Sequence, residues 1–148
     1  PAESARVGGD APIDGQVAGT ETPAAPADSA LTQQLSALST QVDKGRSAFD
    51  ALYPAAADHV RAAAGAAVSS EAWVVAHVDL SALEQARYDS VYALASLDTL
   101  YAERTKALAE GKVQGGVTEI QAVRKAALAT VDAQNDKVDE LKAALKEP

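Results

Sequence analysis

Leucine, valine and alanine recur every three or four residues in three long segments of this chain, and that spacing constrains its fold more than any other feature. In the first segment the repeat runs from Leu31 through Leu35, Val42 and Phe49. Residues at this spacing share one face of an α-helix, because a helical turn has about 3.6 residues. The pattern therefore predicts an all-α fold in which each helix buries one apolar face.

Large side chains are scarce, which limits how these helices can pack. Of the 148 residues, 35 are alanine, four are tyrosine, and phenylalanine and tryptophan occur once each. Alanine favours a helix but buries little apolar area. We therefore expect closely packed helices with narrow leucine and valine seams rather than a β or doubly wound α/β fold, and we place Phe49, Leu94 and Leu128 in the core.

The first predicted helix covers residues 29–67, with Ser29 or Asp28 as its N-cap. Pro54 interrupts it, but the apolar pattern continues in the same phase on both sides. This predicts a kink at Pro54 rather than a reversal of the chain.

The second predicted helix covers residues 70–110 and has Ser69 or Ser70 as its cap. An alternative start at Ser81 is open, because Ser81 and Glu84 also form a capping-box pair.

Glycines 111, 115 and 116 mark the next turn, and the third helix is predicted at residues 117–146, with Thr118 as its possible cap. Because short turns join neighbouring helices, we expect the helices to alternate in direction. The predicted architecture is an elongated antiparallel three-helix bundle, covering residues 29–148.

Residues 1–28 differ from this helical domain. They contain four prolines, four glycines, no leucine, no lysine and no aromatic residue. Such a segment cannot bury enough apolar area to order itself, so we expect an irregular, acidic leader or linker. Leaders of this kind hold exported or lipid-anchored domains away from a surface, which suggests a periplasmic or secreted protein, with a lipid anchor possible N-terminal to this sequence.

The charge and the missing residue types exclude several classes of function. Thirteen Lys and Arg against 21 Asp and Glu give a net charge of -8, which argues against nucleic acid as a partner. No segment approaches the roughly 20 apolar residues of a transmembrane helix. Without cysteine there is no disulfide, thiolate metal site or thiol nucleophile. We find no catalytic or phosphate-binding motif either, and expect a protein that is not an enzyme and has no cofactor.

The two histidines suggest a metal site. If the first turn lies near residues 68–70, antiparallel helices place His59 close to Asp79 and within one turn of His77. Two imidazoles and a carboxylate are a plausible ligand set for a divalent metal, and Asp58 is nearby. The alternative is a pair of half-exposed polar side chains at the edge of a helical hairpin.

Charged residues on the apolar side of the second helix need partners. With the next turn at residues 111–116, Arg87 is expected opposite Asp139, and Asp98 within one turn of Arg124. We predict that these are structural ion pairs that fix the register of the helices. Asn135, which we expect to face Val91, would add to this register.

The sequence therefore favours a non-catalytic, extracytoplasmic helical protein that acts through contact with another protein or through self-association. An alternative is a small-molecule or metal carrier with a site between helices near Trp73 and His77. A third class, a helical coat on a lipid or other hydrophobic surface, would require a large exposed apolar stripe.

Overall fold

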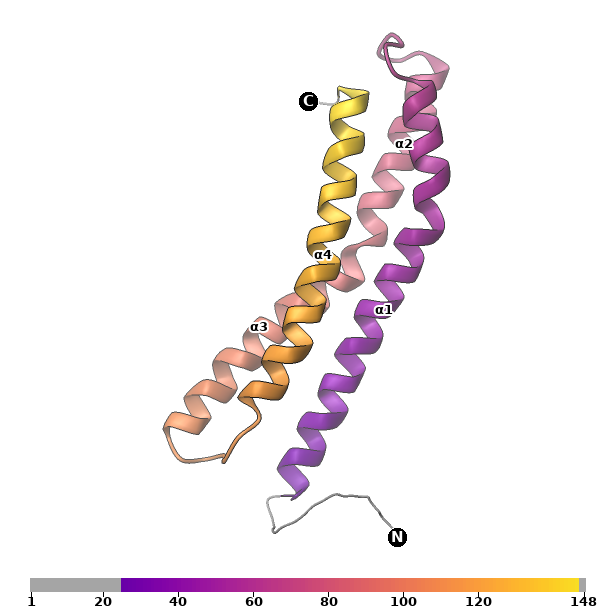
Figure 1. Cartoon of the computed structure of the whole chain (residues 1–148). Coiled ribbons are helices and arrows are strands. Elements are labelled where there is room, and N and C mark those ends of the chain that lie inside the picture. Colours follow the sequence, from indigo (N-terminus) through magenta and orange to yellow (C-terminus); the bar gives the residue numbers. More distant parts are fainter. Residues whose placement is uncertain (1–24, 147–148) are drawn as a thin grey trace. The chain divides into compact units, whose positions relative to one another are not determined.

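The computed structural model describes residues 25–146, and all regular structure in this range is helical (Figure 1). The predicted all-α class and helical bundle are confirmed for these residues, but the predicted leader lies almost entirely outside them. The described residues divide into two compact units, residues 25–36 and residues 37–146. The helices are α1 (Ala25–Ala62), α2 (Glu71–Ala86), α3 (Tyr88–Ala109) and α4 (Val117–Leu145).

Helix α1 is one uninterrupted element with Pro54 inside it. It begins four residues before the predicted start and includes Pro26 in its first turn, where proline is tolerated because the first amides of a helix have no partner. It ends at Ala62 rather than near residue 67. The following turn contains Gly65 at φ 80° and Ser69 at φ 74°, conformations that a helix cannot continue through.

Helix α2 begins where the capping pattern predicts. The Trp73 amide donates a hydrogen bond of 3.3 Å to Ser70 Oγ, so Ser70 is the N-cap and the alternative start at Ser81 is wrong. The single helix predicted over residues 70–110 is also wrong. It is bent and divided at Arg87, which has φ -81° and ψ -8° (Figure 1).

The break lies where the buried face of α2 and α3 contains a long charged side chain and then a small polar one. Arg87 follows the buried Leu83, and Ser90 is fully buried after it. A Cβ atom added to Gly45 of α1 would lie 2.7 Å from the Ser90 backbone nitrogen. The backbones of α1 and α3 therefore approach each other directly at this point, and only a glycine fits at position 45.

Polar side chains complete this crossing. Ser90 Oγ donates a hydrogen bond to the Val42 carbonyl at 3.3 Å. From α4, the Gln134 amide nitrogen lies 3.4 Å from both the Gly45 carbonyl and Ser90 Oγ. Three helices are thus joined at one buried polar point, which favours one register over its neighbours.

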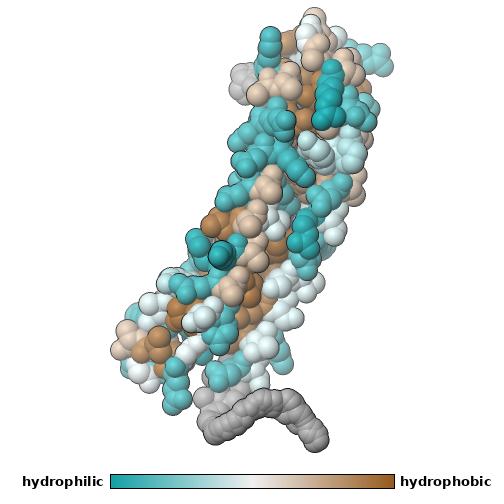
Figure 2. All heavy atoms as spheres, in the orientation of Figure 1, coloured by the Kyte–Doolittle hydropathy of each residue, from teal (hydrophilic) through white to brown (hydrophobic). Residues whose placement is uncertain are grey.

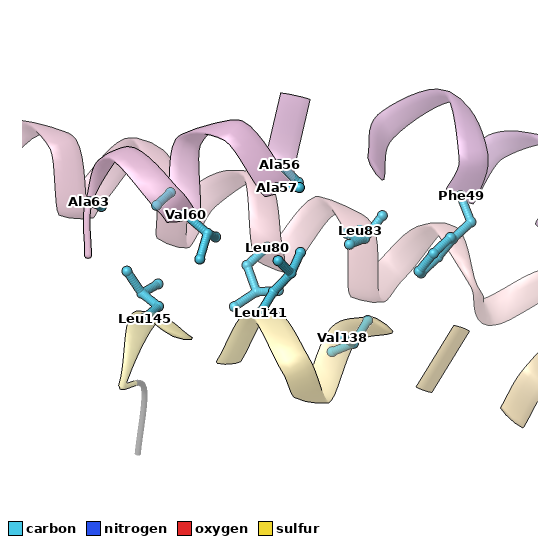
Figure 3. Close-up of a cluster of buried hydrophobic side chains, with 11 residues drawn as sticks. Phe49, Ala56, Ala57, Val60, Ala63, Leu80, Leu83, Val138, Leu141 and Leu145 are labelled. Carbon is cyan, nitrogen blue, oxygen red and sulfur yellow. The ribbon is translucent and has the colours of Figure 1, made fainter. Parts of the chain in front are cut away.

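The main apolar core of residues 37–146 lies between α1, α2 and α4. Figure 3 shows Val60, Leu80 and Leu141 pointing toward one another from these three helices, with Phe49 at one end of the cluster and Leu145 at the other. Phe49, Val60 and Leu80 have no exposed surface. Burial of these few large side chains, at about 25 cal/mol per Å² of apolar area, is the main stabilising contribution in so alanine-rich a chain.

Helix α4 agrees with its predicted range to within one residue. Its N-cap is Gly116, at φ 104°, rather than Thr118. The buried residues of α4 are separated alternately by four and three residues from position 127 onward, the spacing of a coiled-coil seam. They are Ile120, Ala127, Val131, Gln134, Val138, Leu141 and Leu145.

Within residues 25–146, no helix combines the length and the apolar character that a membrane span requires.

Candidate functional site

Two of the three residues predicted to hold a metal come together. His59 on α1 and Asp79 on α2 form a pair in which the imidazole Nδ1 contacts a carboxylate oxygen. The pairing of residue 59 with residue 79 agrees with a turn near residues 68–70. The side chains are 47% and 31% exposed, so solvent weakens the interaction.

His77 has a different neighbour. Its ring stacks on Trp73, one turn earlier in α2, with 5.0 Å between the ring centroids and 9° between the ring planes. Among residues 25–146, no group of three or more histidine, aspartate or glutamate side chains converges closely enough to hold a metal ion. The predicted metal site on His59, His77 and Asp79 stays a prediction.

A shallow cleft of about 300 Å³ borders His59. It is lined by Ala62 of α1 and by Glu71, Ala72 and Val75 of α2, so it lies at the end of the first hairpin where the turn joins the two helices. The carrier hypothesis placed its site near Trp73 and His77, and this cleft lies along the same part of α2.

The ionic contacts of α4 differ in part from those expected. Arg124 forms an ion pair with Asp98 of α3. Arg87, however, donates to Asn135 instead of Asp139, and its Nε is buried without a hydrogen-bond partner in the described residues. Asn135 lies one helical turn before Asp139 on α4, so the contact is offset by one turn from the expected one.

The most unusual surface of the molecule is the outer face of α2 and α3. Every exposed residue between Ala72 and Ser96 is uncharged, although 23% of the whole chain is charged. Large apolar side chains are among them, with Val78 58% and Tyr92 60% exposed. The exposed residues of this uncharged face are Ala72, Val74, Val75, Val78, Ala82, Gln85, Tyr88, Tyr92, Ala95 and Ser96.

A regular line runs along this face. Its members are separated alternately by four and three residues, the spacing by which one helix packs against another in a coiled coil. Ser81 is half-buried and all the others are exposed. We refer to this line as the outer seam: Val74, Val78, Ser81, Gln85, Tyr88, Tyr92 and Ala95.

Two aromatic rings stand side by side in the outer seam. Tyr88 and Tyr92 have ring centroids 5.8 Å apart and planes inclined by 43°. Tyrosine is enriched in protein interfaces because its ring gives apolar contact while its hydroxyl remains able to hydrogen-bond.

Acidic residues flank the outer seam, and two of them have basic partners in the same chain. Asp79 contacts His59, and Glu84 contacts Lys142. The Lys142 charge beside Glu84 lowers the negative potential that a molecule approaching the seam would meet.

We compared the chain with protein-family models, curated proteins and solved structures, and none of the three comparisons found a match.

The sequence analysis does not predict the outer seam, because the strongest apolar pattern of this segment is the one that the structure buries. Ala76, Leu80 and Leu83 belong to that inner line. A second line of residues, separated alternately by four and three positions and starting at Val74, is also present in the sequence. The absence of charge along it was the signal that could have distinguished it from an ordinary solvated face.

Proposed function

We propose that this is a non-catalytic protein that acts by self-association, and that the outer seam of α2 and α3 is the contact between two copies. The observation that supports this most strongly is the coiled-coil spacing of exposed, uncharged residues along both helices. Exposed apolar side chains grouped in this way are typical of protein interaction sites.

The charge distribution of the outer seam is compatible with contact between two copies of the same chain. Two molecules of net charge -8 repel each other, so their contact has to avoid further carboxylates. The outer seam does so, and the flanking Asp79 and Glu84 already have partners. Val78 and Tyr92 supply the apolar contact, while Gln85 between them can pair with its counterpart and fix the register.

A lipid or granule surface is a poorer match. Helices that lie on membranes have basic residues along the border of the apolar face, which attract anionic headgroups. Here the flanking residues Asp79, Glu84 and Asp89 are acidic, and the polar Ser81 and Gln85 interrupt the apolar line.

Sedimentation equilibrium of the whole chain tests the proposal directly. We expect reversible dimerisation between about 1 µM and 1 mM, the range in which small interfaces dissociate. Val78→Glu and Tyr92→Glu should each weaken it by about tenfold or more, because each buries an unpaired carboxylate. Ala126→Glu, on an exposed position of α4, adds the same charge and should leave dimerisation unchanged.

Salt gives an independent readout. Because the seam is apolar and the two copies have the same net charge, dimerisation should become several-fold tighter as ionic strength rises and repulsion is screened. A chain that stays monomeric throughout this concentration range, or an Ala126→Glu variant that loses dimerisation as much as Val78→Glu does, would remove the proposal.

The proposal includes an antiparallel arrangement of the helices in residues 37–146. It is supported by contacts in which residue numbers rise on one helix as they fall on the next, such as His59 with Asp79 and Gly45 with Ser90. A kink at Pro54 and an extracytoplasmic location belong to the same proposal. The location is supported by the composition of residues 1–28.

A carrier is the second candidate, and the observation in its favour is the cleft of about 300 Å³ beside His59. Zinc is the metal to test, since it accepts imidazole and carboxylate ligands. A saturable rise in melting temperature with zinc that His59→Ala abolishes would favour the carrier. The absence of any shift would remove its metal-binding form.

A further inference from the structure

Two half-buried carboxylates, Glu84 and Asp89, lie on opposite borders of the outer seam. Glu84 contacts Lys142 Nζ of α4 at 2.9 Å, so its border faces α4. The Cβ of Asp89 is 3.2 Å from the position that a Cβ atom added to Gly45 of α1 would take, so the other border faces α1. When two helices pack along a seam, the residues on its borders lie beside those of the other helix and decide which partner is accepted.

Glu84 meets a carboxylate of the second copy in either orientation of the two chains. The proposed contact places Gln85 opposite its counterpart, and Glu84 is its neighbour in the sequence. If the two seams run in the same direction, unlike borders meet, and Glu84 lies nearest Asp89 of the second copy. If they run in opposite directions, like borders meet, and Glu84 lies nearest the second Glu84. In both cases a cation beside Glu84 is needed to offset the repulsion.

Lys142 is placed to supply this cation. Its side chain is 37% exposed and that of Glu84 is 24% exposed, so the ammonium group reaches the surface at the border of the seam. An ammonium group has three donors on a flexible stem, so it can bind Glu84 and a second carboxylate at the same time. Arg87, which is close to Glu84 in the sequence, is directed to Asn135 of α4 instead.

We propose that Lys142 controls self-association by binding Glu84 of its own chain together with a carboxylate of the second copy. The inference rests on the proposed contact through the outer seam, and it adds a residue of α4 to that contact. Without the Lys142 charge, Glu84 faces a carboxylate of the second copy with no cation between them, and the two copies separate more readily.

Sedimentation equilibrium of three variants of the whole chain tests this role. Lys142→Gln should weaken dimerisation by about three- to tenfold, because each copy loses one partly exposed ion pair. Lys142→Arg keeps the positive charge and should dimerise within about twofold of the unmodified chain. Lys142→Gln combined with Glu84→Gln removes the cation and the carboxylate together, and should restore most of the affinity that Lys142→Gln loses.

Lys137→Gln is the matched control, since it makes the same change in net charge at another position of α4. Lys137 Nζ lies 4.9 Å from the centre of the Tyr53 ring of α1. Figure 2 shows the molecule from the side of α1 and α4, where hydrophilic side chains are spread along its length. Lys137→Gln should therefore change dimerisation by less than about twofold. Urea denaturation should give similar midpoints for Lys142→Gln and the unmodified chain, which separates a loss of contact from a loss of folding.

The inference fails if Lys142→Gln dimerises as tightly as Lys137→Gln, or if adding Glu84→Gln to Lys142→Gln restores nothing. A difference between Lys142→Gln and the unmodified chain that does not shrink as ionic strength rises would also contradict it, because salt screens exposed charges. An unmodified chain that stays monomeric removes self-association and this inference with it. A chain whose dimer is lost with Val78→Glu but kept with Lys142→Gln removes only this inference.

Discussion

The outer face of α2 and α3 and the outer face of α4 are both exposed helical surfaces, but they differ in charge. On α4, exposed alanines alternate with charged residues such as Lys125, Asp132, Asp136 and Lys137. On α2 and α3, the exposed residues from Ala72 to Ser96 include none that is charged.

Alanine and valine occur on the faces of these helices for two different reasons. The inner faces of all these helices are apolar because they are buried. The outer face of α4 has the charges of a surface that stays in water. An exposed face without such charges is typical of a surface that contacts another molecule.

The largest expected effect on stability comes from the buried core beneath both outer faces. Phe49 is the largest fully buried side chain, and Phe49→Ala should lower the free energy of unfolding by about 3–5 kcal/mol. Leu52 is 42% exposed on the same helix, and Leu52→Ala should cost less than about 1 kcal/mol. Urea denaturation of both variants measures the difference. Equal losses would mean that the core is not centred where α1 meets α2 and α4.

The next largest expected effect concerns the bend at Arg87, which lies between the α2 and α3 parts of the uncharged face. Gly45→Ala places a methyl group against the Ser90 backbone, which should cost about 1–3 kcal/mol, partly offset by the roughly 1 kcal/mol that alanine gains over glycine in a helix. A net loss is expected. Because α3 has to move, dimerisation should weaken too, although position 45 is far from the outer seam in sequence.

Gly115→Ala is the control for this substitution. Gly115 has no neighbouring atom within 4 Å of an added Cβ, so stability should change by no more than about 0.5 kcal/mol. If Gly45→Ala proved as stable as Gly115→Ala, the close contact between α1 and α3 would not control the bend.

The smallest expected effect concerns an exposed ion pair between α3 and α4. Asp98 and Arg124 form an ion pair with side chains 52% and 38% exposed, and Asp98→Asn should cost less than about 1 kcal/mol. Addition of salt should reduce even this difference, because exposed pairs are screened. A loss of several kcal/mol in thermal or urea unfolding would show that this pair is a structural centre of the bundle.

The sequence predicted the helices better than the contacts between them. Ser70 and the glycines near residue 115 marked two helix boundaries correctly, because capping and positive φ are local properties. The break at Arg87 has no proline or glycine to announce it. It lies beside the close approach of Ser90 to Gly45, a residue distant in the chain that contacts Ser90 only after folding.

The same limit explains the errors in individual residues. Leu94 and Leu128 were expected in the core but are half-buried, whereas Gln134, which was not expected there, is buried. A helical pattern defines a face only to within about one residue, so it does not decide between neighbouring positions on the same side. Arg87 contacts Asn135, one turn before the expected Asp139.

Single-cysteine cross-linking tests the central claim most directly, since the natural chain has no cysteine. Cysteines at Val78, Gln85 and Tyr92 should oxidise to covalent dimers much faster than cysteines at neighbouring positions off the seam, such as Ala82. A cysteine at Ala129 of α4 should remain monomeric. Rapid dimer formation through Ala129→Cys, with no preference for the seam positions over Ala82, would contradict the account.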